Sequence, residues 1–252
     1  MGNIAPETIE AYFAAIRRRD IKLLDRYLAT YPDIVSVRED SRFTTTGLHV
    51  ACALNDKRMI LRLLQAGAPL TITNGFHDTP LMTAVHAGHS KAVQILLNHG
   101  QHPDATDIAT LRTTPLHIAA RNGDAAIASL LIAAGAAIDV RDSSNWTPLH
   151  QAVIGHGSFD YMGEGPVHMY CHLQMRVLTL LLRHGADPNA RGWRGATPLH
   201  EAASVNCTRI LRLLLQYGAD STIRDDADET PLDRARRREY PEIVAVLQSL
   251  PG

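Results

Sequence analysis

Histidines are the first residues of this chain to suggest chemistry, with 13 among its 252 residues. Three of them share one short stretch with a cysteine: His156, His168, Cys171 and His172. Imidazole nitrogens and thiolate sulfurs are ligands that zinc prefers in proteins. The stretch is therefore a candidate metal site, although its spacing does not follow a close-paired zinc pattern.

Two carboxylates, Asp160 and Glu164, lie in the same stretch. Such a pair could act in general acid–base catalysis if the stretch folded over a substrate groove. No phosphate-binding glycine loop, nucleophile elbow or HExxH motif accompanies it. An enzyme or metal-binding protein is therefore the alternative function. We assign no catalytic residue and expect no cofactor.

A repeated motif, Thr-Pro-Leu-His or a near variant, indicates the elements that must position these residues. Its threonines are Thr46, Thr79, Thr114, Thr147, Thr197 and Thr230, at steps of 33, 35, 33, 50 and 33 residues. A glycine follows 21 residues after four of these threonines, at Gly67, Gly100, Gly135 and Gly218. After Thr147 the glycine is Gly185, 38 residues on. One repeat therefore carries an insertion of 17 residues.

The repeated segments resemble the ankyrin repeat family. The clearest matches are TPLHIAARNGDAAIASLLIAAGAAIDVRD from Thr114 and TPLHEAASVNCTRILRLLLQYGADSTIRD from Thr197. The resemblance implies an all-α solenoid of about seven helix pairs, with β-hairpin fingers before each motif and one inserted loop. It also implies that the motif histidines His49, His117, His150 and His200 tie neighbouring repeats together by hydrogen bonds.

Local chemistry agrees with this resemblance, because Thr caps helices and Pro fits the first helical turn. The glycine suits the left-handed end of a second helix. Some repeats depart from the motif: Gly47 stands in place of Pro, Met82 in place of His, and Asp233 in place of His. A pair of helices cannot bury its apolar face alone, so the repeats are expected to stack.

We expect residues 1–252 to form a single domain. Residues 1–45 would be a degenerate N-terminal capping repeat, and residues 46–229 full repeats with the insertion at about 155–171. Residues 230–252 would be the C-terminal capping repeat.

Large aromatic residues concentrate on the predicted fingers and the insertion. The chain has four Phe and two Trp residues, and only Phe13 lies elsewhere. Exposed aromatic and arginine side chains are typical of interface hot spots. The predicted binding residues, on the fingers, the lining helices and the insertion, are Arg42, Phe43, Phe76, His77, His86, Arg112, Arg121, Trp146, Trp193, Arg194, Phe159 and Tyr161.

This pattern predicts a non-catalytic interaction module, or adaptor, that binds a protein or an extended peptide. Because the face is locally basic, an acidic peptide is favoured. The net charge of −1 argues against nucleic acid as the partner, and no apolar run is long enough to span a membrane. We expect a monomer in the cytoplasm, with the nucleus also open, and reduced thiols at the three cysteines.

One smaller pattern concerns modification. Leu181, Asp187 and Asn189 resemble the pattern of ankyrin asparagines that a dioxygenase hydroxylates. The alternative is that Asn189 forms hydrogen bonds to the finger turn.

Overall fold

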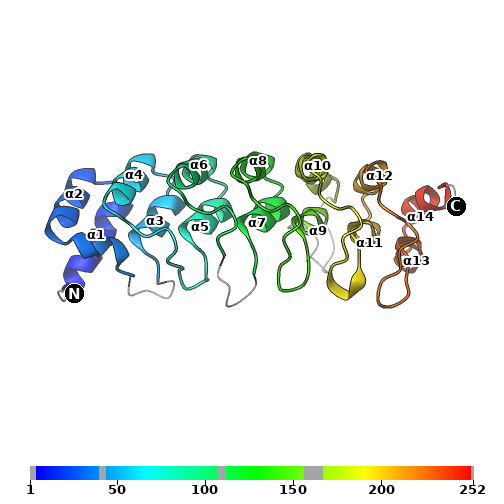
Figure 1. Ribbon diagram of the computed structural model, residues 1–252, viewed down its shortest axis with the longest axis horizontal. Coiled ribbons are helices and arrows are strands. Elements are labelled where there is room, and N and C mark those ends of the chain that lie inside the picture. The colour runs from blue at the N-terminus through cyan, green and yellow to red at the C-terminus, as the bar shows by residue number, and fades with distance from the viewer. Residues whose placement is uncertain (1–3, 40–43, 107–111, 156–166, 251–252) are drawn as a thin grey trace.

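The computed structural model describes residues 4–39, 44–106, 112–155 and 167–250, apart from the side chains of residues 167–173. Within these ranges the chain forms helices that stack from the N-terminus to the C-terminus in one elongated array (Figure 1).

The helices form two rows. The first helices of the pairs, here called the inner helices, are α1 (Pro6–Arg17), α3 (Gly47–Ala53), α5 (Pro80–His86), α7 (Pro115–Asn122), α9 (Pro148–Ile154), α11 (Pro198–Ser204) and α13 (Pro231–Arg237). The outer helices are α2 (Ile21–Thr30), α4 (Lys57–Gln65), α6 (Ser90–Asn98), α8 (Ala125–Ala133), α10 (Val167–Arg183), α12 (Thr208–Gln216) and α14 (Pro241–Gln248). The described residues therefore confirm the all-α solenoid of seven helix pairs.

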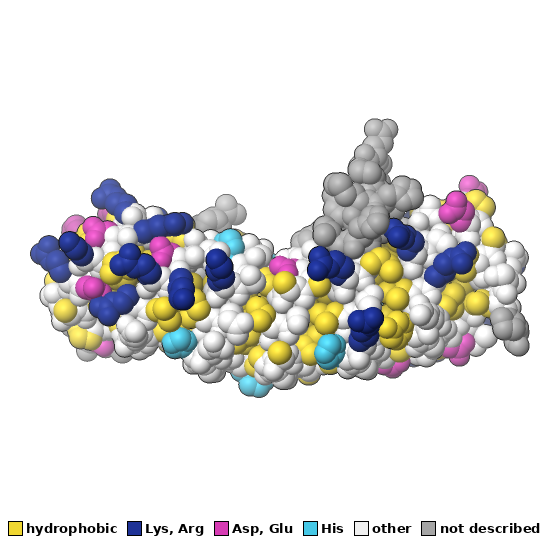
Figure 2. Space-filling view, turned by 90° about the horizontal axis from the view of Figure 1, so that it is seen from above, with side chains coloured by type: hydrophobic (Ala, Val, Ile, Leu, Met, Phe, Trp, Pro, Cys, Tyr) yellow, Lys and Arg dark blue, Asp and Glu magenta, His cyan; other side chains and the backbone are white. Residues whose placement is uncertain are grey.

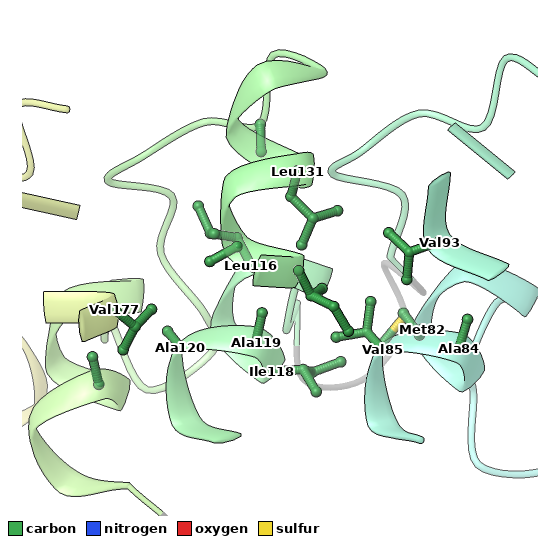
Figure 3. Packing of buried hydrophobic residues seen from close by; sticks show 14 of the residues in the cluster. Met82, Ala84, Val85, Val93, Leu116, Ile118, Ala119, Ala120, Leu131 and Val177 are labelled. Atoms are coloured by element: carbon green, nitrogen blue, oxygen red, sulfur yellow. The ribbon is translucent and has the colours of Figure 1, made fainter. Parts of the chain in front are cut away.

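Each row packs against itself and against the other. Neighbouring inner helices contact one another, as do neighbouring outer helices. The face of the outer helices carries many Lys and Arg side chains and fewer Asp and Glu (Figure 2). One hydrophobic cluster runs through the array from Tyr12 to Leu247. Figure 3 shows part of it, where Val85 of α5 and Ile118 of α7 lie between the two inner helices.

The core is built almost entirely from aliphatic and small side chains, and its aromatic members lie at the N-terminal end. Tyr12 and Phe13 of α1 are fully buried, with their ring centroids 5.2 Å apart in an edge-to-face arrangement. Tyr12 and Ile16 of α1 explain Gly47. A Cβ atom at that position would lie 2.2 Å from the Tyr12 hydroxyl and 2.7 Å from Cδ1 of Ile16. The missing proline is thus a consequence of how the first repeat packs.

The motif histidines connect successive repeats. Nδ1 accepts hydrogen bonds from the backbone N–H and the hydroxyl of the motif threonine, at 3.2 and 2.9 Å for His117 and Thr114. Nε2 then donates to a carbonyl before the next motif, and these bonds join His49 to Asp78 (2.9 Å), His117 to Trp146 (3.0 Å), His150 to Ala196 (3.2 Å) and His200 to Glu229 (3.0 Å). These bonds form the histidine ladder.

The last repeat shows why His is replaced there. The Asp233 carboxylate accepts bonds from the Thr230 N–H (3.0 Å) and hydroxyl (2.7 Å), as Nδ1 does elsewhere. Asp233 thus takes over the accepting role of the motif histidine in the pair α13–α14, and no finger is described after that pair. A carboxylate, which only accepts hydrogen bonds, is therefore sufficient.

The fingers are tight hairpin turns. In the finger at residues 74–78, Asn74 and Asp78 are joined by a backbone bond of 2.9 Å, and the Asn74 side chain accepts from the N–H groups of Phe76 and Asp78. Asp142 and Asp225 repeat this arrangement at residues 142–146 and 225–229. The only β-bridge among the described residues joins Arg38 and Thr46.

The insertion changes one outer helix. α9 ends at Ile154 and α10 begins at Val167, so the last five residues of the predicted insertion, 167–171, belong to a helix. α10 has 17 residues, whereas α8 and α12 have 9 each.

Two described cysteines differ in state. Cys52 is a buried free thiol, and burial raises its pKa. Cys207 is disulfide-bonded, so the expectation of reduced thiols is wrong for this residue.

A second ladder joins the loops that follow the outer helices. Asp104 accepts from the Ala137 N–H at 3.1 Å, and Asp139 accepts from the Asp187 N–H at 3.2 Å. Asn189 is the third member: its Oδ1 accepts from the Asp220 N–H at 2.7 Å, while its Nδ2 donates to the Gly218 carbonyl at 3.0 Å.

Replacing Asn189 by Ala is expected to lower the free energy of unfolding by about 1–2 kcal/mol, because two inter-repeat hydrogen bonds are lost. Asn189→Asp should cost less, because a carboxylate still accepts from Asp220 but cannot donate to Gly218. Urea denaturation of the three proteins measures both effects. Equal stability of Asn189→Ala and the unchanged chain would contradict a structural role for this side chain.

Candidate functional site

A cavity of about 300 Å³ opens between the finger at residues 74–78, the start of the next repeat, and helices α5 and α7. It brings together five of the predicted binding residues: Phe76, His77, His86, Arg112 and Arg121. Its other lining residues are Asp78, Met82, Thr106, Thr113 and Ile118, which the sequence analysis did not select.

The cavity lies where the histidine ladder is interrupted. Met82 occupies the motif position of His, and its thioether cannot donate a hydrogen bond. By the register of the other repeats, the partner carbonyl would belong to Thr113, which also lines the cavity. The departure at Met82 was the sequence signal that could have located this site.

The finger presents Phe76 to solvent. Its side chain is 63% exposed, and the Asn74 side chain fixes the turn beneath it by accepting from its N–H at 2.8 Å. His77 follows with φ of 65°, the left-handed conformation that reverses the chain. Phe76 is thus an exposed ring on an ordered turn.

The cavity has more positive than negative lining residues. Arg112 and Arg121 line it together with a single carboxylate, that of Asp78. Nε2 of His86 lies 3.5 Å from Oδ1 of Asp78, so this carboxylate has a partner when His86 is protonated.

Among the charged lining residues, Arg121 has an unusual environment. It is half-buried, and its Nε is shielded from solvent without a hydrogen-bond partner. Burial lowers the pKa of its guanidinium, and the nearby Asp142 carboxylate opposes that shift. The cost of such burial is offset where a counter-charge or ligand can approach.

The remaining described binding candidates lie on fingers further along the array. Trp193 is 54% exposed, and the guanidinium carbon of Arg194 lies 4.3 Å from its ring centroid, a cation–π contact. Trp146 is half-buried. Its Cδ1 would lie 2.6 Å from a Cβ at position 192, so Gly192 makes room for the ring. Trp193 is thus exposed on its finger, whereas Trp146 is half-buried beside Gly192 of the next finger.

Several predicted site residues lie outside the described residues. These are the binding candidates Arg42, Phe43, Phe159 and Tyr161, the metal candidates His156, His168, Cys171 and His172, and the carboxylates Asp160 and Glu164. Of these, the backbone of His168, Cys171 and His172 is helical, within α10. Among the described side chains, no group of three or more His, Cys, Asp or Glu residues is placed to hold a metal ion.

A second hollow on the described surface is distinct from this site. A larger hollow of about 560 Å³ lies between the outer helices α8 and α10, lined by Ala125, Ala126, Ser129, Met175, Arg176, Thr179 and Leu180. It contains none of the predicted binding residues.

No helix within the described ranges has the length and apolar character to cross a bilayer.

An ion-pair network that the sequence analysis missed stabilises the C-terminal repeats. The Arg234 guanidinium contacts Asp225 at 2.7 Å and Glu201 at 3.2 Å, and so joins α13 to α11 and to the last finger. Both carboxylates are well shielded from solvent, which identifies the network as part of the fold.

Comparison with known proteins agrees with this architecture. A family model described as "Ankyrin repeats (3 copies)" matches residues 12–107, 104–162 and 167–251. The chain is 36% identical over 106 residues to cyclin-dependent kinase 4 inhibitor B of Rattus norvegicus, covering 42% of this chain and 80% of the relative. It is 32% identical over 187 residues to the human SH3 and multiple ankyrin repeat domains protein 2, covering 73% and 9%.

The chain spans less than half the length of two other relatives that it matches. The chain is 36% identical over 108 residues to glycerophosphocholine phosphodiesterase gde1 of Schizosaccharomyces pombe, covering 42% of this chain but only 9% of that protein. It covers 43% of a putative ankyrin repeat protein of Fowlpox virus, at 30% identity over 165 residues, or 63% of this chain. The match to the repeat model nevertheless spans most of the sequence. Taken with seven stacked helix pairs, it shows that this chain belongs to the ankyrin repeat family.

Proposed function

We propose that the chain is a non-catalytic interaction module that binds a protein or an extended peptide with its fingers and the adjoining inner helices. The observation that carries the proposal is the exposure of Phe76 and Trp193, at 63% and 54%. They are the large hydrophobic side chains that stand out from the described surface, and both lie on fingers. Exposed aromatic residues of this kind supply much of the binding energy at protein interfaces.

The family supports the same class of function, because ankyrin repeats generally mediate protein–protein interactions. Arg112, Arg121 and Arg194 lie on the finger side, and they favour an acidic partner over nucleic acid or a membrane. We also propose that the chain acts as a monomer.

The proposed compartment is the cytoplasm, with the nucleus open. Fractionation of source cells decides between these locations.

Affinity capture tests the proposed function. The unchanged chain, immobilised and exposed to lysate of its source cells, should retain specific proteins. Phe76→Ala with Trp193→Ala should reduce that capture at least tenfold, because truncating one hot-spot residue typically costs about 2 kcal/mol or more. Quantitative mass spectrometry of the retained proteins gives the measurement.

A matched pair of substitutions away from the fingers serves as the control. Lys91→Ala with Gln94→Ala changes two exposed residues of the outer helix α6 and should leave capture unchanged. Thermal unfolding of both double variants should resemble that of the unchanged chain. Equal capture by the finger variant and the control would overturn the proposal.

A further inference from the structure

Arg121 is a half-buried, charged residue. No ion pair joins its guanidinium to any residue within the described part of the chain. Its Nε is shielded from solvent and has no hydrogen-bond partner. Arginines that serve the fold behave differently here, as Arg234 shows with its contacts to Asp225 and Glu201.

Asp142, whose charge acts on Arg121, accepts its hydrogen bonds from other groups. Oδ1 of Asp142 accepts from the N–H groups of Ser144 (2.8 Å) and Trp146 (3.0 Å). Oδ2 accepts from Nε2 of Gln151 at 3.1 Å. Asp142 therefore lowers the cost of the Arg121 charge through space while leaving its donors available.

The surroundings of Arg121 define the kind of group that would fit. The cavity of about 300 Å³ is at the small end of ligand sites, which suits one or two side chains of a partner. The exposed Phe76 ring supplies most of its apolar surface, and the largely buried Met82 adds a little, whereas Ile118 lies fully buried behind it. Such a site favours a side chain with an aliphatic stem and a single negative charge at its end.

A carboxylate fits this site better than a phosphate. Guanidinium groups bind carboxylates through two parallel hydrogen bonds. Asp78 also lines the cavity, and its negative charge would oppose a doubly charged phosphate more strongly than a singly charged carboxylate.

We propose that the cavity between the finger at 74–78 and helix α7 is a pocket for one Asp or Glu side chain of the bound partner. Arg121 is its ion-pairing residue, Arg112 adds positive charge, and Phe76 covers the aliphatic stem. The inference rests on the proposed function and specifies which chemistry the groove recognises.

A peptide-display selection with the full chain as bait tests this pocket. Random peptides enriched by the unchanged chain should share an Asp or Glu at one fixed position. Peptides enriched by Arg121→Gln should lack it. Failure of the unchanged chain to enrich any peptide would overturn the proposed function and this inference together. Enrichment without a fixed acidic position, or the same acidic position for both baits, would overturn the inference alone.

Binding measurements with an enriched peptide then assign the contact. Changing its acidic residue to the corresponding amide should weaken binding to the unchanged chain about tenfold, as expected for loss of a charge-assisted hydrogen bond. The same change should have little effect on binding to Arg121→Gln. With Phe76→Ala, overall affinity should fall while the preference for acid over amide remains. An acid-over-amide preference that persists in Arg121→Gln would overturn the assignment.

Two controls separate specific recognition from general attraction and from misfolding. The outer-helix face is also rich in Lys and Arg (Figure 2), and Arg183→Gln on α10 removes one exposed charge there. It should keep the full acid-over-amide preference. Arg121→Gln should unfold at a temperature no lower than the unchanged chain, because it removes a shielded, unpaired charge. A clear loss of stability would show that Arg121 serves the fold, and would overturn the proposal.

Discussion

Lowering the pH from 7.5 to 4 is expected to destabilise the chain by several kcal/mol, through the histidine ladder. Burial lowers the pKa of His49, His117, His150 and His200, and brings that of His150 to about 4. Each ring accepts at Nδ1 and donates at Nε2, so it must be neutral to make both bonds.

The direction of this pH dependence follows from whether the folded or the unfolded chain binds protons more readily. In the unfolded chain these histidines take up protons below about pH 6.5, whereas in the folded chain they do so only at lower pH, near pH 4 for His150. Their contribution is therefore complete above pH 6.5 and is lost as the pH falls toward 4. For His150 alone the loss is about 3 kcal/mol, since one pKa unit corresponds to about 1.4 kcal/mol.

Urea denaturation at pH 7.5, 6.5, 5.5 and 4.5 measures this loss. Gln94→Ala on the outer helix α6 provides the control, because it changes an exposed side chain that carries no ionisable group and should leave the dependence on pH unchanged. His117→Gln should lower stability at pH 7.5 but reduce the further loss on acidification. Burial raises the pKa of Glu201 and of Asp139, which acts in the opposite direction nearer pH 4. A free energy of unfolding that stays constant from pH 7.5 to 4.5 would contradict the ladder's role.

The second large effect is expected from Gly47→Ala, which should lower the free energy of unfolding by about 1–3 kcal/mol, the usual cost of overpacking a core. The added Cβ would lie 2.2 Å from the Tyr12 hydroxyl, 2.7 Å from Cδ1 of Ile16, and 2.9 Å from the ring carbon that bears the hydroxyl. Because all three atoms are in the interface between α1 and α3, the substitution should loosen the N-terminal repeat.

Tyr12→Phe gives the matched test of this contact. The Tyr12 hydroxyl is buried without a hydrogen-bond partner, so its removal should leave stability unchanged or raise it. Combined with Gly47→Ala, it should recover part of the loss, since the closest clash disappears. Thermal unfolding of the two single variants and the double variant measures the coupling. Strictly additive effects would show that the two positions do not interact as described.

Much of the fold was predictable because the information is local. A threonine that caps a helix, a proline in its first turn and a glycine at its end act within a few residues, and they recur in each repeat. The count of helix pairs follows from that recurrence, and so does the role of the motif histidines. Phe76 and Trp193 were also selected from the sequence, by their positions before the motif.

The burial of each finger residue was not predictable in the same way. Trp146 and Trp193 occupy fingers of neighbouring repeats and have the same side chain. Trp146 is half-buried because Gly192 of the next finger leaves space for its ring, whereas Trp193 stays exposed. The difference depends on a residue in another repeat, about 46 positions away for Trp146, and only the packing reveals it.

By itself, the sequence determined the repeat, the family and the surface on which to look for a partner, because helix caps and motif spacing are local properties. The tertiary structure decided which of the candidate residues meet. It placed Phe76, His86, Arg112 and Arg121 around one cavity, at the repeat where Met82 interrupts the ladder. It also left Arg121 shielded and unpaired. Burial and the absence of a counter-charge depend on every neighbour in space, and no pattern along the chain encodes them.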